Sequence, residues 1–273
     1  MFIIDESTNN DLIYRRENGR FMDHGYDPDT VDLTLLNPMQ GIFGDEPGQI
    51  PLIPESEWDA RFDEQERLQS SLQHLRDRQP NGMPTLYQNG QGYCWAYSTT
   101  RACEYLRILM GLPYVQLSGH AIGCKVQNFR NEGLWCGASA KFVAENGVPS
   151  TKVWPQGSMN RSLDNAATWA ESKKNLITED WRDSSVALWD NQLTAQQRAT
   201  LLFNNIPFMC DFNWWRHSVL ATRWMRIEPG NWGLQIDNSH GDDFGERGRA
   251  VLQGSRARPD GACALRVITA SLL

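Results

Sequence analysis

The chain has 273 residues, of which 40% are hydrophobic, so it can bury a core in one or two domains. Its formal net charge is −7, with 17 acids and 7 arginines in residues 1–80 against 16 acids and 19 bases in residues 81–273. An acidic first part and a second part without a basic cluster argue against nucleic acid as a partner.

Other classes are excluded by patterns that the chain lacks. No run of 18 apolar residues exists, which argues against a membrane partner. The acidic start MFIIDESTNND has no basic region like that of a secretory signal, so we expect a cytoplasmic protein, or one carried into an assembling particle. Without an export signal the six cysteines are expected to be free thiols, and because their spacings contain no CxxC and no paired histidines, no metal site is expected. Phosphate- and dinucleotide-binding motifs are also missing, so no cofactor is expected.

Residues 1–80 are predicted to form an acidic N-terminal arm plus one helix. Residues 1–53 are rich in Asp, Asn, Gly and Pro, and read either as a solvated segment or as an arm lying across the core or a neighbouring protein. Residues 56–78 predict one helix, with a capping box from Ser56 to Asp59 and an apolar stripe. The stripe consists of Trp58, Phe62, Leu68, Leu72 and Leu75. The stretch RQPNGMP then marks a boundary near residue 80.

Residues 81–273 are predicted to form the second domain, with helices first and strands later. Apolar spacing predicts a helix from Cys94 that Gly111 and Pro113 end, and further helices over 137–146, 164–175 and 192–205. Short, partly alternating segments predict strands at 207–212, 217–227, 232–237 and 262–269. This order indicates the α+β class.

Cys94 lies where the first of these helices begins. Unpaired N–H groups and a partial positive charge at a helix start favour the thiolate, which is the nucleophilic form. A thiol nucleophile also needs a base and a group that orients the base. His217 begins an apolar strand, and Asn238 follows the next strand, just before a glycine-rich turn.

Three motifs in this order resemble those of the papain-like cysteine peptidases. The nucleophile motif is matched by QNGQGYCWA from Gln88 to Ala96, and the histidine strand by HSVL from His217. The turn motif is matched by NSHGDDFGERG from Asn238. The resemblance covers about residues 84–272 and leaves the first 80 residues unmatched.

The resemblance implies a two-lobed fold, with a helical lobe, a strand-rich barrel-like lobe, and a groove between them. It implies that Cys94 is the nucleophile, that His217 is its base, and that Asn238 orients the imidazole. Gln88 would donate to the oxyanion together with the backbone N–H of Cys94. The loosely matched Gly133 would pair its backbone with an extended peptide substrate.

Two further residues would surround this site without reacting. Trp95 follows the nucleophile, and His240 stands where the family has a tryptophan that shields the bond between asparagine and histidine. The family's cysteine three residues before the nucleophile is Gln91 here, so that disulfide cannot form.

The N-terminal region resembles that of papain-like proteins encoded by tailed phages and some bacteria, on the stretch IPESEW before a helix and the NWW before His217. Two functions follow. One is a cysteine peptidase acting on peptide or protein substrates, which the intact Cys, His, Asn and Gln favour. The alternative is a non-enzymatic or weakly active structural protein of a phage virion, a capsid-associated or minor capsid protein bound to other virion proteins through the arm. The arm and His240 favour this alternative.

Overall fold

The structure is a computed structural model that describes residues 1–13, 16–17, 20–21, 25–32, 42–46, 48–79, 82–176, 185–190 and 193–267. Its helices are α1 (Asn10–Ile13), α2 (Trp58–Leu68), α3 (Leu72–Asp77), α4 (Cys94–Leu109), α5 (Gly119–Val126), α6 (Cys136–Asn146), α7 (Ala166–Ser172) and α8 (Ala195–Phe203). Its strands are β1 (Ile3–Ile4), β2 (Arg16–Glu17), β3 (Arg20–Phe21), β4 (Ser185–Asp190), β5 (Phe208–Phe212), β6 (His217–Glu228), β7 (Asn231–Asp237), β8 (Arg249–Leu252) and β9 (Gly261–Val267).

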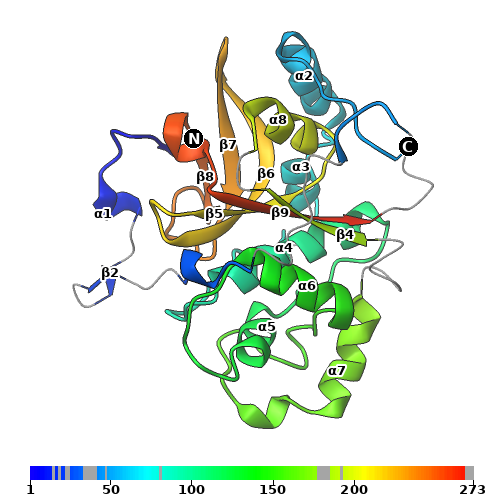
Figure 1. Ribbon diagram of the computed structural model, residues 1–273, viewed down its shortest axis with the longest axis vertical. Helices are drawn as coiled ribbons and strands as arrows, with labels where there is room; N and C mark the ends of the chain where they lie inside the picture. The colour runs from blue at the N-terminus through cyan, green and yellow to red at the C-terminus, as the bar shows by residue number, and fades with distance from the viewer. Residues whose placement is uncertain are drawn as a thin grey trace.

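A seven-stranded sheet forms one part of the molecule, in the order β1-β8-β7-β6-β5-β9-β4. All neighbours in it are antiparallel except β1 and β8, which run parallel. A strand-side core packs against this sheet and includes Phe208, Val219 and Leu234. Figure 1 shows α5, α6 and α7 gathered below the sheet, with α4 between them and the strands. The α+β expectation is therefore confirmed.

Helix α4 is the central element of the helical region. The sequence predicts one apolar face, but 14 of its 16 residues, Cys94 to Arg107, are buried. A helix that is enclosed on all sides lies in the middle of a core, so a stripe on one face understates its burial. Some of its polar side chains bond within the helix itself, since the Thr99 and Thr100 hydroxyls donate to carbonyls of α4.

The single helix expected over 56–78 is instead two helices, α2 and α3. Gln69 ends α2 in the left-handed region, with φ 52°. Trp58 packs in the strand-side core, whereas Leu72 packs in the helical core. One straight helix could not place these two side chains in different cores. Leu68, expected in the apolar stripe, is 51% exposed.

The expected capping box at Ser56 is also wrong. Helix α2 has Glu57 as its N-cap, and Glu57 makes no capping hydrogen bond through its side chain. A capping box is found instead at the start of α3, between Ser71 and His74. The chain therefore restarts a helix at residue 71 with its own hydrogen-bond cap.

Parts of the N-terminal arm belong to the strand-side core. Strand β1 pairs with β8, and Ile4 and Ile13 are almost fully buried. Ile50 and Ile53 are buried in the same core, and the Ile53 N–H donates to the Thr200 hydroxyl at 3.0 Å. These contacts integrate the described arm into the fold, while the boundary near residue 80 stays a prediction.

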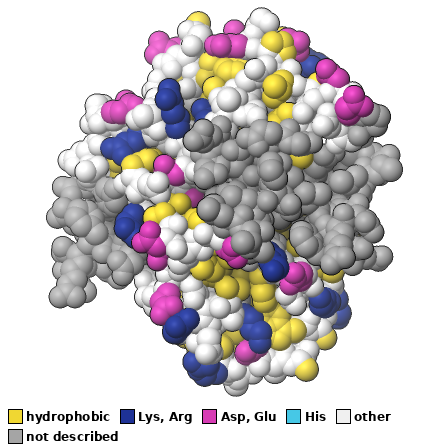
Figure 2. Space-filling view, viewed as in Figure 1, with side chains coloured by type: hydrophobic (Ala, Val, Ile, Leu, Met, Phe, Trp, Pro, Cys, Tyr) yellow, Lys and Arg dark blue, Asp and Glu magenta, His cyan; other side chains and the backbone are white. Residues whose placement is uncertain are grey.

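Several elements were not expected from the sequence, namely α1, α5, β1, β2, β3, β4 and β8. In the helices that were expected, the stop at Gly147 is confirmed, since this residue caps α6 with φ 71°. On the face seen in Figure 2, the acidic and basic side chains of the described residues are interspersed, so no single sign of charge dominates it.

Candidate active site

Cys94 is the first residue of α4, and its side chain is fully buried. Its Sγ accepts a hydrogen bond at 3.3 Å from the backbone N–H of Ser218, the second residue of β6. The sulfur from the helical region therefore lies against the beginning of the strand that carries His217. Burial raises the pKa of the Cys94 thiol to about 12; the Ser218 N–H lowers it, and the charge of Asp211 raises it further.

The imidazole of His217 lies against the side chain of Asn238. Its Nε2 lies 2.7 Å from the Asn238 Oδ1, which also accepts the backbone N–H of Ser239 at 2.7 Å. An amide oxygen can only accept, so Nε2 carries the proton and Nδ1 is the basic nitrogen. Both residues are buried. This tautomer is the one that a general base needs if it uses Nδ1.

Aromatic rings surround the imidazole. The ring centroid of His240 lies 4.4 Å from that of His217, and the Trp215 centroid lies 4.8 Å from it. Phe244 stacks on Trp215 at 5.9 Å. His240 therefore lies beside the imidazole, as expected, and Trp215 adds a large apolar surface. The sequence analysis did not single out Trp215 as a site residue, although the NWW motif contains it.

Gln88 is held firmly at the edge of the same site. Its Oε1 accepts the Ser239 hydroxyl at 2.6 Å, and its Nε2 donates to the Gln91 carbonyl at 2.6 Å. Its backbone N–H donates to the Ser239 carbonyl at 2.9 Å, and an antiparallel bridge joins Tyr87 to His240. The segment with Gln88 is thus fixed directly to the turn that follows Asn238.

Trp95 supports the loop before the nucleophile. It is fully buried, and its Nε1 donates to the Gly92 carbonyl at 2.9 Å. The Gly92 N–H in turn donates to Asn131 Oδ1 at 2.5 Å. These bonds fix the backbone two residues before Cys94 and link it to the segment that contains Gly133.

At Gly133 the structure places a piece of the N-terminal arm. The Leu134 N–H donates to the Gly25 carbonyl at 2.8 Å, and the Asp27 N–H donates to the Leu134 carbonyl at 3.3 Å, so Tyr26 and Leu134 form a parallel bridge. A Cβ on Gly133 would lie 2.7 Å from the Gly25 carbonyl oxygen. The backbone beside Gly133 therefore pairs with an extended segment, and that segment belongs to the chain itself.

The same arm segment contacts the strand side of the site. The Tyr26 N–H donates to the Arg216 carbonyl at 3.1 Å, and the exposed Arg216 guanidinium lies 3.8 Å from Asp27. Arg216 directly precedes His217 and adopts φ 49°, so it lies in the turn before β6. Tyr26 is only 4% exposed. Residues 25–27 thus bridge the backbone beside Gly133 and the residue before His217, where the resemblance implies the substrate groove.

Asp211 on β5 is a buried carboxylate that the sequence analysis missed. It accepts the Ser218 hydroxyl, and its Oδ2 accepts the backbone N–H of Cys136 at the start of α6 at 3.0 Å. Burial raises the pKa of Asp211 to about 6. Through Ser218, whose N–H contacts the Cys94 sulfur, this carboxylate connects α6 to the start of β6.

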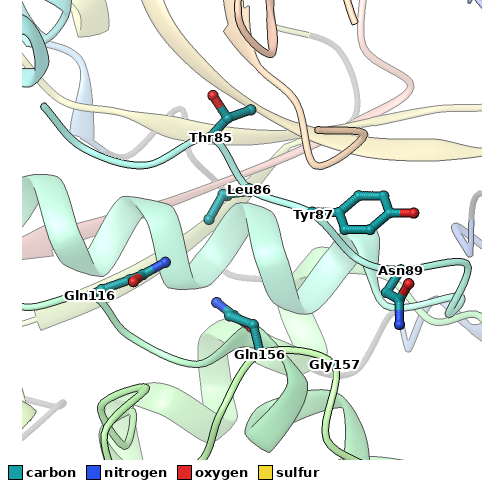
Figure 3. A pocket seen from close by; sticks show the side chains of 7 residues that line it. All are labelled: Thr85, Leu86, Tyr87, Asn89, Gln116, Gln156 and Gly157. Carbon is teal, nitrogen blue, oxygen red and sulfur yellow. The ribbon is translucent and has the colours of Figure 1, made fainter. Parts of the chain in front are cut away.

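A separate pocket of about 350 Å³ lies on the chain segment next to Gln88 (Figure 3). Its lining contains no histidine, cysteine or charged side chain. It is formed by Thr85, Leu86, Tyr87, Asn89, Gln116, Gln156 and Gly157.

The described residues contain no cluster of three or more His, Cys, Asp or Glu side chains that fits a metal ion. All six cysteines are free and buried. In the part of the chain with assigned structure, no helix combines the length and apolar character that crossing a membrane requires.

The chain resembles known proteins in sequence and in fold. No protein-family model matches the chain. It is 23% identical over 201 residues to zingipain-2 of Zingiber officinale, covering 69% of this chain and 91% of the relative. A similar match, 23% over 197 residues, is found with zingipain-1 of the same plant, covering 68% of this chain and 88% of the relative.

Solved structures share the fold. Xylellain, a cysteine protease from Xylella fastidiosa, superposes with a TM-score of 0.59 at 15% identity, covering 91% of this chain and 97% of its own. Digestive procathepsin L 3 of Tenebrio molitor superposes with a TM-score of 0.54 at 14% identity, covering 78% and 87%. The chain therefore has the papain-like fold, and its sequence is similar to those of the two zingipains.

Proposed function

We propose that the chain is a cysteine-type peptidase that hydrolyses peptide bonds in peptide or protein substrates. Cys94 is the nucleophile, His217 the general base and acid, and Asn238 the group that orients the imidazole. The observation that carries the proposal is the bond between His217 Nε2 and Asn238 Oδ1, together with the Cys94 sulfur lying against the start of β6.

The chemistry follows from these positions. The Cys94 thiol transfers its proton to His217 Nδ1, and the thiolate attacks the substrate carbonyl carbon. The Gln88 amide and the Cys94 backbone N–H stabilise the negative oxygen that forms. His217 then protonates the leaving amine, and water, deprotonated by His217, hydrolyses the thioester to release the acid and restore the thiol.

The arm must leave before a substrate can enter. Residues 25–27 use the backbone of Leu134 and Arg216, and a substrate lying along the same groove needs these groups. Displacement also brings water to the sulfur, which removes the burial that raises the thiol pKa. The structure therefore represents a closed form, and the peptidase acts from an open one.

The experiment compares matched thiol variants in a background whose arm is displaced by Gly25→Ala. A mixed peptide library is incubated with the protein, and the products are read by mass spectrometry. Cys94→Ala should abolish cleavage, while Cys103→Ala, which removes another buried thiol of α4, should retain it. Equal cleavage by both variants, or none by the parent, would refute the assignment.

One observation favours a second function. The fully buried thiol of Cys94 and the covered groove also suit a protein that keeps the fold without turning over a substrate. Such a protein would be a structural component of a phage virion that binds other virion proteins through its arm. A parent protein that cleaves nothing in the library with its arm displaced would favour this second function. Either function is compatible with the cytoplasmic or virion-associated location expected from the sequence.

A further inference from the structure

A buried charge cluster lies behind Asn238. Asp237, the last residue of β7, is 3% exposed, and its two carboxylate oxygens contact three donors. Arg76 Nη1 of α3 lies 2.7 Å from Oδ1, and the Tyr105 hydroxyl donates to Oδ2 at 2.9 Å. Arg101 Nε lies 3.7 Å from Oδ2 and pairs through Nη1 with Glu104 at 2.8 Å.

The cluster is balanced, because two arginines face two carboxylates. Buried charges are tolerated only when they are paired, so removing one partner leaves another uncompensated and moves the backbone that carries it. The cluster joins α4, the helix that begins at Cys94, to the end of β7, where Asn238 follows. It also includes α3, which lies in the first 80 residues.

Arg76 contacts the side chain of the residue before Asn238 and the backbone of the turn after it. Besides Asp237, it donates through Nη2 to the Arg247 carbonyl at 3.1 Å. The next residue, Gly248, offers the carbonyl that accepts the backbone N–H of Asn238 at 2.8 Å. One guanidinium therefore holds both the residue before Asn238 and the turn that Asn238 is bonded to.

We propose that Arg76 is a positioning residue: through Asp237 and the turn at Arg247 it holds Asn238 in reach of His217 Nε2. The inference rests on the proposed function, in which Asn238 orients the imidazole. It gives α3 a role in the site, although the sequence motifs that resemble the family begin only at Gln88. A planar guanidinium suits the task because it donates in two fixed directions at once.

The test follows the proton on His217 Nε2, which needs no substrate and no open groove. In ¹⁵N-labelled protein, this proton gives a downfield signal that His217→Gln identifies, and its exchange with solvent is measured. Arg76→Met should make this exchange about tenfold faster or more, because residues in contact have interaction free energies that correspond to factors of this size. Arg76→Lys, which keeps the charge without the two-pronged geometry, should give an intermediate rate.

The matched control is Arg223→Met. Arg223 is also buried, at 2% exposed, and it pairs with Glu66 and lies over the Phe62 ring, at 4.6 Å, on the part of β6 beyond the site. This variant should lower the melting temperature as Arg76→Met does and leave the exchange rate unchanged. Equal exchange in the two variants would overturn the inference, since it would make Arg76 merely structural.

A second variant keeps the inference testable if Arg76→Met does not fold. Asp237→Asn keeps the side-chain volume and the Tyr105 contact but releases Arg76, and it should also speed the exchange; a wild-type rate in this variant would overturn the inference. A wild-type protein in which the His217 signal is already unprotected would instead overturn the proposed function, because the bond to Asn238 would then be missing at the outset.

Discussion

Substituting Gly25 by alanine should open the groove. Gly25 adopts φ +90°, and a Cβ there would lie 2.3 Å from the backbone carbon and oxygen of Gly92. A backbone obstacle cannot rotate away as a flexible side chain can, so the arm has to move. Because Gly92 is two residues before Cys94, the arm should move away from the nucleophile.

The size of the effect follows from two costs. A left-handed conformation with a side chain costs about 1 kcal/mol, and overpacking against fixed atoms costs about 2 kcal/mol. Together they destabilise the closed form by about 3 kcal/mol, and at ~1.4 kcal/mol per tenfold the open fraction rises about 100-fold.

The assay is alkylation of Cys94 by iodoacetamide, located by mass mapping of peptides. When reclosing is fast compared with alkylation, the rate follows the open fraction, so the rate at Cys94 should also rise about 100-fold. Cys103, buried in the same helix, reports unfolding and should keep its wild-type rate.

Gly48→Ala is the matched control. Gly48 has nearly the same backbone conformation, φ +87°, yet a Cβ there meets nothing within 4 Å. The Gly48→Ala variant therefore has the same backbone strain as Gly25→Ala but no steric clash. Cys94 in this variant should react at the wild-type rate. If the two alanine variants react alike at Cys94, the arm does not control access to the groove.

Three further changes test the chemistry in the Gly25→Ala background. Gln88→Ala should lower kcat about 10²–10³-fold with little change in KM, because the lost donor acts on the oxyanion of the transition state; an effect confined to KM would contradict that role. Asn238→Ala should lower kcat/KM by about 10–100-fold, the equivalent of one buried hydrogen bond of ~1–3 kcal/mol, and should speed solvent exchange of the His217 imidazole proton; unchanged kinetics would contradict its orienting role. Asp211→Asn should move the alkylation profile of Cys94 to lower pH, because the Asp211 charge raises the thiol pKa. Since burial also raises the pKa of Asp211 from 3.8 to about 6, the stability that this group contributes is present below pH 3.8 and lost as the pH rises through 6. Chemical denaturation at a series of pH values should show that loss in the parent protein and not in Asp211→Asn.

Local sequence was sufficient for the features that depend on neighbouring residues. The start of α4 at Cys94, the stop of α6 at Gly147 and the strands that carry His217 and the residue before Asn238 all follow from spacing and turn residues. Three short motifs in order also indicated the fold, because each is formed by residues within a few positions of one another.

The sequence was insufficient where two cores compete for one segment. Residues 56–78 carry an apolar spacing that predicts a single helix, and the break at Gln69 becomes visible only when Trp58 and Leu72 are assigned to different cores. Likewise, β1 has two residues and no periodicity of its own, and its pairing with β8 depends on a strand that lies almost 250 residues away.

The chain by itself therefore determined the order of its chemical groups and the type of its longer elements, since helix and strand periods are properties of adjacent residues. Only the tertiary structure decided that residues 25–27 lie across the groove and that Arg76 bonds Asp237, 161 positions away. Contacts of this kind depend on which surfaces meet when the chain folds, and no local spacing records them.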